Sequence, residues 1–288
     1  MLRRPALAAL SLAFALTLAG CGGDPEPSAD VPNPVRVPPS SAAPERSYVA
    51  LGDSYTAAPL ISSDPVTDGC LRSSVNYPAL VAEELGYSLT DVSCSGATTA
   101  NLRTTQATTT GDVPPQLDAL EEDTALVTLG MGGNDDSVFA RLIGCATNQT
   151  SCRDRAGLEA AVDGLGDHLT DAIAAIRERA PQAKVVVVGY PQIIDADASC
   201  ADRFPLPDAV RPFLAGLNER LHTVQQRAAR AAEVSYVDLY DASADHGVCA
   251  DEPWVNGLET KPGVGLAVHP LAAGQAAAAE LVLAAVAG

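Results

Sequence analysis

Short apolar runs alternate with longer amphipathic stretches along most of the chain, beginning at Ser47. Five runs have the length and flanking turn residues of buried β-strands: 48–52, 89–94, 125–130, 184–190 and 234–239. Four stretches have helical spacing: 77–85, 158–180, 207–233 and 271 to about 287. The run Val185-Val186-Val187-Val188 is apolar on both faces, as a central parallel strand requires. The pattern predicts an α/β fold, a three-layer α/β/α sandwich around a parallel sheet of about five strands.

The beginning of the chain lacks this alternation. A positively charged start and an apolar run too short for a membrane span lead into Leu18-Ala19-Gly20-Cys21, so residues 1–21 are interpreted as a lipoprotein signal peptide with a lipobox. Cleavage would leave Cys21 as the lipidation site; the alternative is an ordinary secretory signal. Residues 22–46 are rich in Pro and Ser and predict a semi-extended tether. We therefore expect one folded domain over 47–288, exported and either lipid-anchored to the outer face of the cell membrane or secreted.

Composition and charge exclude some classes of protein. Hydrophobic residues make up 47% of the chain, enough to bury a substantial core, so the protein is not disordered. The formal net charge of -18 gives no electrostatic reason to bind nucleic acid or an anionic membrane surface. We find no internal repeat and expect a monomer.

The seven cysteines stand at positions 21, 70, 94, 145, 152, 200 and 249. Without Cys21 an even set remains, which in an exported protein predicts three disulfides. Six cysteines allow many pairings and the sequence does not choose among them. Our working expectation is nearest-neighbour pairing: Cys70–Cys94, Cys145–Cys152 and Cys200–Cys249. A metal site is the alternative, but no Cys-x-x-Cys pair occurs and only His246 lies near a cysteine, so no metal is expected.

Four polar blocks follow the predicted strands or precede the last helix. Parallel strands bring their carboxyl ends to one edge of a sheet, so these blocks should meet. A serine there needs a base and oxyanion donors before it can act as a nucleophile. Taken singly, each block also has an ordinary structural explanation, such as a helix N-cap or a turn. The blocks are Gly52-Asp53-Ser54-Tyr55, Cys94-Ser95-Gly96-Ala97-Thr98, Gly132-Gly133-Asn134-Asp135 and Val268-His269-Pro270.

Together and in this order, the blocks resemble those of the SGNH hydrolases, also called the GDSL lipase/esterase family. The matching residues are Ser54, Gly96, Asn134 and His269, and the resemblance covers essentially all of 47–288. It implies hydrolysis of carboxylic esters through an acyl-serine, with Ser54 as nucleophile, His269 as base and no cofactor. The implied oxyanion donors are the N–H groups of Ser54 and Gly96 and the side-chain amide of Asn134. The three-disulfide layout further suggests the secreted actinobacterial esterases and lipases of this family.

One position departs from the family pattern. The family usually has an aspartate three residues before the histidine, where it orients the imidazole, but this chain has Leu266. Some actinobacterial members use a backbone carbonyl instead, so we expect a Ser–His dyad oriented by the carbonyl of Leu266 or a near neighbour. A more distant carboxylate, Asp241 or Asp251, is the alternative. Asp53 is expected to be structural and to bond loop amides.

The remaining histidines compete poorly as the base. His168 and His222 lie in amphipathic helices and are expected to be exposed, which leaves His246 as the only rival. Three loops, 56–76, 136–156 and 191–208, are expected to form the acyl pocket. Four of the chain's apolar side chains could line that pocket or belong to the core: Tyr55, Leu60, Phe139 and Phe204.

The substrate expected from the resemblance is a small-molecule or lipid ester. Alternatives are a deacylase of a polysaccharide or glycolipid, an acyltransferase, and a non-catalytic envelope lipoprotein that binds a ligand in the same cleft. A protein of the last kind could lose its nucleophile or base, whereas this sequence keeps both Ser54 and His269.

Overall fold

The computed structural model describes residues 46–62, 69–148, 151–197 and 200–288. The predicted signal peptide, the lipobox cysteine Cys21 and all of the predicted tether except Arg46 lie outside the described residues. The chain divides after Ala42, and every element below belongs to the second unit, 43–288. None of the helices in the described ranges is long and apolar enough to cross a membrane.

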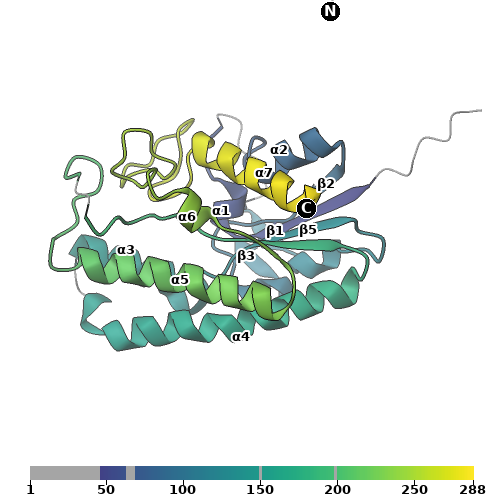
Figure 1. Ribbon diagram of the computed structural model, residues 1–288, viewed down its shortest axis with the longest axis horizontal. Helices are drawn as coiled ribbons and strands as arrows, with labels where there is room; N and C mark the ends of the chain where they lie inside the picture. The colour runs from purple at the N-terminus through teal and green to yellow at the C-terminus, as the bar shows by residue number, and fades with distance from the viewer. Residues whose placement is uncertain (1–45, 63–68, 149–150, 198–199) are drawn as a thin grey trace, which may run out of the picture. The chain divides into compact units, whose positions relative to one another are not determined.

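A five-stranded parallel sheet forms the centre of this unit, as the sequence predicted (Figure 1). Its strand order is β2-β1-β5-β6-β7, so the chain moves outward in one direction from β1 to β2 and in the other from β1 to β5. In parallel sheets of this kind, ligands bind outside the carboxyl ends of the two strands at such a switch point. The strands are β1 (Ser47–Gly52), β2 (Ser88–Asp91), β5 (Leu126–Gly130), β6 (Lys184–Val188) and β7 (Ser235–Val237).

Apolar residues on both faces of the strands explain why the sheet is buried. Along β6, Val185 and Val187 belong to one apolar cluster, whereas Val186 and Val188 belong to the other. Successive side chains of a strand point to opposite faces, so a continuous apolar run buries itself only between two layers. The run Val185–Val188 therefore needs helices on both sides of the sheet.

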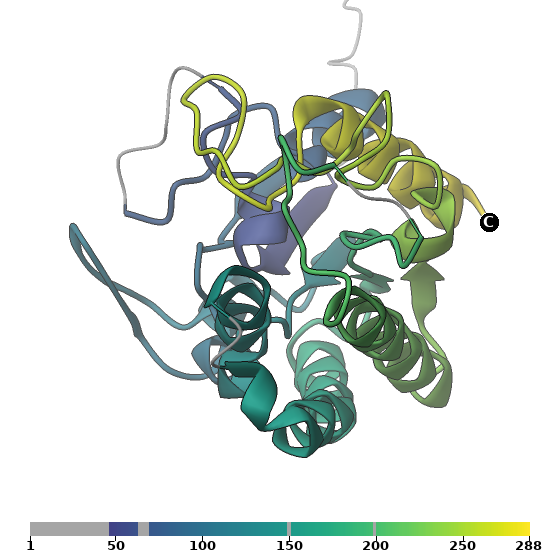
Figure 2. The same ribbon diagram turned by 90° about the vertical axis from the view of Figure 1, so that its left-hand side faces the viewer.

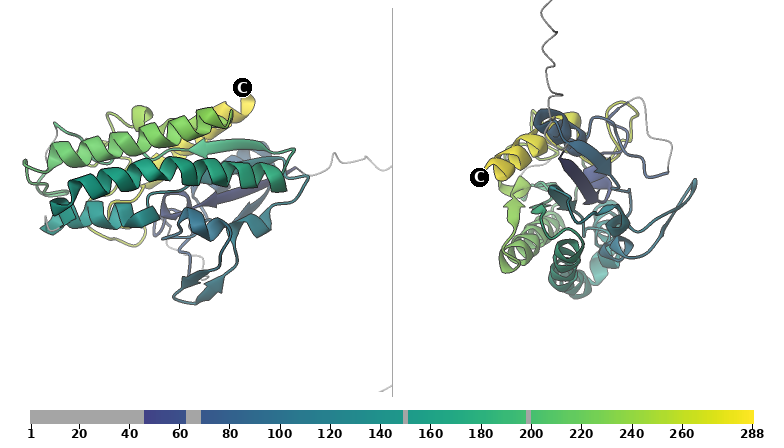
Figure 3. Two further views of the ribbon diagram at one scale, coloured as in Figure 1. Left: turned by 90° about the horizontal axis from the view of Figure 1, so that it is seen from below. Right: turned by 90° about the vertical axis from the view of Figure 1, so that its right-hand side faces the viewer.

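Helices supply those two layers and complete the predicted sandwich. On one face α2 (Tyr77–Leu85) packs against α7 (Ala272–Ala287), drawn above the sheet in Figure 1. The other face is covered by α3 (Val138–Asn148), α4 (Arg155–Arg179) and α5 (Arg211–Ala231), as Figure 2 also shows. The long helices α4 and α5 lie side by side, which the left view of Figure 3 shows from below.

Shorter elements connect these layers. Strands β3 and β4 form an antiparallel hairpin outside the main sheet, visible as the projection at the left of Figure 2. The short elements are α1 (Ser54–Ala57), η1 (Thr99–Leu102), β3 (Gln106–Thr108), β4 (Gly111–Val113), η2 (Gln116–Ala119), η3 (Asp135–Ser137), η4 (Ser151–Arg153) and α6 (Leu239–Ala242).

Two expectations from the sequence were wrong in detail. Much of the predicted loop 136–156 is the helix α3, which buries Val138, Leu142 and Cys145 along one face. The predicted strand 89–94 ends as β2 at Asp91, because the Asp91 carboxylate accepts from the following backbone and turns the chain.

The structure contains three disulfides, and their pairing is the nearest-neighbour one expected. The Cα atoms of each pair lie 4.3, 4.8 and 5.3 Å apart, in chain order. The first disulfide joins the loop before α2 to the loop after β2, so it lies in the segment that carries Gly96. The pairs are Cys70–Cys94, Cys145–Cys152 and Cys200–Cys249.

Candidate active site

Ser54 stands at a sharp junction between β1 and α1. The chain leaves β1 at Gly52, where an added Cβ would lie 2.2 Å from the Oγ1 of Thr56 and 2.8 Å from the carbonyl oxygen of Gly130. Asp53 is the N-cap of α1 and its carboxylate accepts the N–H of Tyr55 at 2.9 Å. The glycine and the cap together place the Ser54 hydroxyl at the carboxyl end of β1.

His269 comes from the loop before α7 and contacts Ser54 directly. Its Nε2 lies 2.8 Å from the Ser54 Oγ, and its Nδ1 lies 2.7 Å from the carbonyl oxygen of Ala267. Because a carbonyl oxygen can only accept, Nδ1 carries the proton and Nε2 is left to accept from the serine hydroxyl. Burial lowers the pKa of His269 below its usual 6.5, although the Ala267 bond opposes this shift. The imidazole is therefore neutral, as a general base must be.

The carbonyl that orients the imidazole is one residue later than Leu266. The Leu266 oxygen instead accepts from the Asn256 side chain at 3.0 Å and from the N–H of His269 at 3.3 Å. The second of these bonds closes a turn in which Val268 has a φ of +58°. The peptide between Ala267 and Val268 lies in the middle of this turn, so it is the Ala267 carbonyl that faces the ring.

Neither of the aspartates considered as alternatives orients the base. Asp241 lies in α6, where its N–H bonds the carboxylate of Asp238, and Asp251 is exposed. Among the described residues, no carboxylate bonds His269.

The other histidines lie elsewhere. His222 was expected to be exposed, but it is buried beside the ring of Tyr240 at 4.9 Å, because it lies on the inner side of α5. His168 is half-exposed. His246, the rival base, bonds the carbonyl of Glu252 and stacks on Trp254.

One group of side chains has the ligand types of a metal site. His222, Asp238 and Asp241 offer one nitrogen and two carboxylate oxygens within 4.8 Å of one another. In the part of the chain that the structure describes, none of the three bonds Ser54 or His269, so this group takes no part in the dyad.

The expected oxyanion donors lie on loops that are bonded to one another. Gly96 has a φ of +81°, a conformation that favours glycine, and Asn134 donates one amide hydrogen to the carbonyl of Ala97 at 3.0 Å. The second amide hydrogen of Asn134 remains available. Within the described ranges, the N–H groups of Ser54 and Gly96 donate to no other protein atom. All three groups thus have a hydrogen to give to a ligand.

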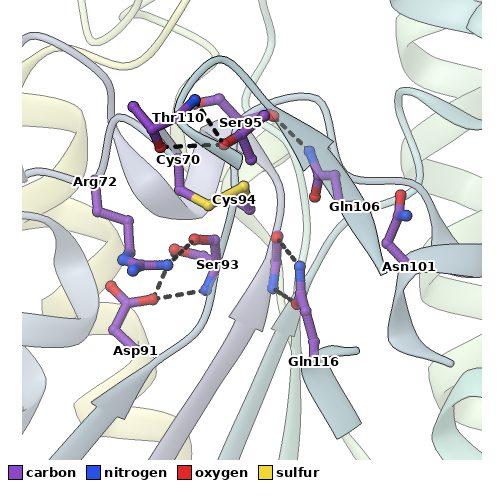
Figure 4. Close-up of a disulfide and its surroundings, with 12 residues drawn as sticks. Cys70, Arg72, Asp91, Ser93, Cys94, Ser95, Asn101, Gln106, Thr110 and Gln116 are labelled. Atoms are coloured by element: carbon purple, nitrogen blue, oxygen red, sulfur yellow. Dashed lines mark hydrogen bonds between the residues drawn. A yellow bond between two sulfur atoms is a disulfide. The ribbon is translucent and has the colours of Figure 1, made fainter. Parts of the chain in front are cut away.

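Figure 4 shows how the loop that carries Gly96 is held. The Cys70–Cys94 disulfide anchors its start, and the N–H of Ser95 donates to the Cys70 carbonyl at 3.1 Å. From β3, the Gln106 amide donates to the Ser95 carbonyl at 2.9 Å. The Cys94–Ser95 and Ser95–Gly96 peptide groups are therefore both held by hydrogen bonds, so the Gly96 N–H has a defined direction.

Asp135 joins the Asn134 turn to the residues after Gly96. Its carboxylate accepts the N–H of Thr99 at 3.0 Å and also accepts the Thr99 hydroxyl, while His168 contacts it at 3.3 Å. Asp135 thereby fixes two of the expected donor segments relative to each other. No role was predicted for Asp135, although it stands directly after Asn134.

Tyr190 links the nucleophile junction to the glycine turn before Asn134. Its hydroxyl donates to the Asp53 carboxylate at 2.5 Å and accepts the N–H of Gly133 at 2.8 Å. Asp53 is fully buried, and this burial raises its pKa to about 7. Asp53 therefore bonds a loop amide, as expected, and also the Tyr190 hydroxyl. No motif or spacing in the sequence pointed to Tyr190.

An aromatic cluster lies behind the dyad. The ring of Tyr55 lies 5.2 Å from the His269 ring, 5.2 Å from Phe139 and 5.0 Å from Tyr190, measured between centroids. Tyr55 and Phe204, candidates for either pocket or core, are both buried. Tyr55 also lines a cavity of about 20 Å³ beneath Pro270, which has room for about one water molecule and none for an acyl chain.

Comparisons with known proteins identify the family of this chain. Residues 50–277 match the GDSL-like Lipase/Acylhydrolase family. "Lipase 2" of Streptomyces coelicolor is 38% identical over 265 residues, covering 84% of this chain and 86% of the relative. The solved phospholipase A1 of Streptomyces albidoflavus superposes with a TM-score of 0.72 at 28% identity, covering 84% and 98%. The extracellular lipase of Streptomyces rimosus also gives a TM-score of 0.72, at 27% identity, covering 83% and 99%. The chain therefore belongs to the GDSL-like lipase/acylhydrolase family and is a lipase or esterase of that family.

Proposed function

We propose that the protein hydrolyses carboxylic esters through an acyl-serine formed on Ser54. The observation that carries this proposal is the hydrogen-bonded chain from the Ser54 hydroxyl through His269 to the Ala267 carbonyl, with links of 2.8 and 2.7 Å. This chain gives the serine a neutral base in the correct tautomer and within proton-transfer distance.

In the first half-reaction the Ser54 oxygen forms a bond to the ester carbonyl carbon while its proton moves to Nε2 of His269. The electron pair of the carbonyl double bond moves onto oxygen, and the N–H groups of Ser54 and Gly96 and the Asn134 amide stabilise that oxyanion. When the oxyanion re-forms the double bond, the bond to the leaving oxygen breaks. The proton on His269 passes to that oxygen, releasing the alcohol and leaving the acyl-serine.

The second half-reaction repeats these steps with water. His269 takes a proton from water as its oxygen bonds the acyl carbon, and a second oxyanion forms in the same position. Its collapse breaks the bond to the Ser54 oxygen, which regains the proton from His269, and the carboxylic acid leaves. Every proton that moves is held by Ser54, His269 or a reactant, so no cofactor is required.

Hydrolysis of p-nitrophenyl esters from acetate to palmitate by residues 47–288 tests the proposal. We expect turnover that Ser54→Ala abolishes and that the control Ser243→Ala retains, since Ser243 is a buried serine in the loop after α6. The preferred chain length separates an esterase from a lipase. Phosphatidylcholine vesicles form a further arm, because the solved S. albidoflavus relative is a phospholipase A1. Turnover unchanged in Ser54→Ala, or no turnover of any ester by a folded sample, would contradict the proposal.

The proposal extends to where the enzyme acts. We infer that the chain is cleaved before Cys21, that Cys21 is lipidated and that 22–46 tether a monomeric domain, 47–288, at the outer face of the cell membrane. The order of Leu, Ala, Gly and Cys at the end of the apolar run supports this. The extracellular location named for the S. rimosus lipase supports export.

A further inference from the structure

Tyr55, the residue after the nucleophile, reaches across the site to the loop of the base. Its hydroxyl donates to the carbonyl oxygen of Val268 at 2.6 Å, in a buried bond between residues 213 positions apart. Its ring packs against the ring of His269 at an interplanar angle of 31°. One side chain thus contacts both the base and the residue before it.

Val268 has a backbone conformation that needs such support. Its φ of +58° lies in the left-handed region, which a β-branched residue adopts only when its surroundings enforce it. Val268 is the third residue of the turn closed by the His269 N–H, the position where a type II turn places glycine or asparagine. Rotation about its N–Cα bond sets the orientation of the preceding peptide, whose oxygen is the Ala267 carbonyl that holds Nδ1.

Both backbone polar groups of Val268 form hydrogen bonds. Its N–H donates to the Gly257 carbonyl at 2.8 Å, and its own carbonyl accepts from Tyr55. A flip of the Ala267–Val268 peptide toward the unstrained conformation would break the Gly257 bond, and the Tyr55 bond fixes the next peptide, so the turn cannot relax by moving as a whole. Within the described residues, Tyr55 supplies the only side-chain bond to the N–H and C=O groups of Val268 itself.

Tyr55 is itself fixed at both of its backbone groups. Its N–H is held by the Asp53 carboxylate at 2.9 Å and its carbonyl by the Gln275 amide at 3.0 Å. Gln275 is buried in α7, the helix that follows His269. The tyrosine is therefore a rigid bridge from the nucleophile junction to the loop of the base.

We propose that Tyr55 is a positioning residue for His269: its hydroxyl holds the strained Val268 turn so that the Ala267 carbonyl keeps the imidazole aligned on Ser54. This inference rests on the ester hydrolysis proposed above and deepens it. In an enzyme with a carboxylate partner, charge attraction would help to keep the imidazole in place. Here the neutral Ala267 carbonyl keeps the imidazole in place, and the direction of this carbonyl depends on the φ torsion of Val268.

Loss of the Tyr55 hydroxyl has a consequence for the imidazole itself. The Ala267 bond raises the pKa of His269 against the effect of burial, so a carbonyl that turns away lets this pKa fall further. The groups in contact with the ring are the Ser54 hydroxyl and the Tyr55 phenol, with the Asp53 carboxyl next to Tyr55. The Ser54 hydroxyl and the Tyr55 phenol are uncharged, and Asp53 bonds Tyr55 through its backbone N–H, which Tyr55→Phe keeps, so a fall in the pKa of His269 would report the Ala267 bond.

The test compares Tyr55→Phe with Tyr48→Phe. Tyr48 is also fully buried and its hydroxyl also makes one bond, to Thr128 at 2.8 Å, but it belongs to the apolar cluster on the α2 and α7 side. In Tyr55→Phe we expect kcat to fall by about 10- to 100-fold with KM nearly unchanged, because small misplacements of a catalytic group have effects of this size. The Nδ1–H proton resonance of His269 should move upfield and its pKa should fall. Tyr48→Phe should match the wild type in all of these.

The resonance and the pKa need no substrate, so they also apply if the wild type hydrolyses no ester; that result would count against the proposed function alone. A His269 resonance and pKa that do not change in Tyr55→Phe would overturn the role of Tyr55, whatever happens to kcat. A changed His269 resonance with an unchanged kcat, in an enzyme that hydrolyses esters, would also overturn the role of Tyr55.

Val268→Gly provides a second test if Tyr55→Phe folds poorly. Glycine adopts the positive φ without strain, so the turn no longer depends on the tyrosine hydroxyl. In the Val268→Gly background we expect Tyr55→Phe to change kcat by less than about 3-fold, a clear coupling in the double-mutant cycle. Equal fold losses in both backgrounds would overturn the proposal.

Discussion

His269 is oriented by a peptide carbonyl, which offers the developing imidazolium a dipole where a carboxylate would offer a full charge. Burial disfavours the imidazolium further, and the 2.7 Å bond to Ala267, which also fixes the tautomer, opposes that effect.

The base should remain active at mildly acidic pH. His269 must be neutral to accept the serine proton, and burial lowers its pKa below 6.5, so it stays neutral as the pH falls through that value. We expect the acid limb of kcat/KM, measured with a soluble p-nitrophenyl ester, to have an apparent pKa below 6.5. Asp53, whose pKa is about 7, titrates nearby in pH but not at the reacting atoms. Asp53→Asn should therefore leave the acid limb of kcat/KM at the same pH. An acid limb that disappears in Asp53→Asn would contradict its assignment to His269.

Asn134 should contribute to the transition state and little to substrate binding. Its free amide hydrogen stabilises charge that appears only in the oxyanion, so Asn134→Ala should lower kcat by about 10²–10³-fold with a small change in KM. Asn101→Ala serves as the comparison, because the Asn101 side chain caps the neighbouring turn by accepting the N–H of Thr98 at 2.9 Å. Equal losses in the two variants would indicate a structural role for Asn134.

At the element scale, much of the fold could be predicted because the signals were local. Each strand could be located in the sequence as an apolar run, and the four polar blocks stand next to strands or the last helix. The end of β2 and the helix α3 were misjudged, since Asp91 turns the chain through its own side chain and α3 is a short helix whose Cys145 is joined to Cys152, just after the helix ends.

The connections within the site could not be predicted in the same way. The choice of Ala267 over Leu266 depends on the φ of Val268, which no residue preference indicates. The bond between Tyr190 and Asp53 joins residues 137 positions apart, so only the folded chain reveals it. Sequence reasoning thus predicted the pair Ser54 and His269, which the structure brings into contact, and missed the residues that bond to the loops on either side.

The disulfide Cys70–Cys94 should stabilise the fold and shape the site. It closes a loop with a sequence separation of 24, which in the chain-entropy treatment corresponds to about 3 kcal/mol. We expect the double variant Cys70→Ala/Cys94→Ala to lose about that much in urea unfolding and to lose kcat as well, because the Gly96 loop loses its anchor. Cys145→Ala/Cys152→Ala, whose separation is 7, should lose less stability and keep kcat. A kcat that survives the first variant would contradict the anchoring role.

At the scale of the whole molecule, all of the described elements lie in the unit 43–288, and the site is complete within it. In the proposed arrangement, the catalytic residues lie in the domain 47–288, and the segment before it determines where the enzyme is located. The net charge of -18 favours solubility over adhesion to anionic surfaces, so attachment to a membrane would depend on the lipid alone.

The prediction of a lipoprotein signal peptide with a lipobox over residues 1–21 can therefore be tested apart from catalysis. The full chain, expressed in a bacterium that processes lipoproteins, should incorporate a labelled fatty acid and sediment with membranes. Cys21→Ala should lose both properties, while the domain 47–288 alone should keep full esterase activity. A Cys21→Ala protein that is still labelled would refute the lipobox interpretation, and an unlabelled wild type released into the medium would favour the ordinary secretory signal.

The most direct measurement is the site of covalent modification by a fluorophosphonate, read by peptide mass mapping of the active enzyme. The account predicts a single adduct on Ser54, formed at least about 100-fold more slowly in His269→Ala because the serine then lacks its general base. An adduct on another residue, or esterase activity that persists after Ser54 is fully modified, would contradict the acyl-serine mechanism.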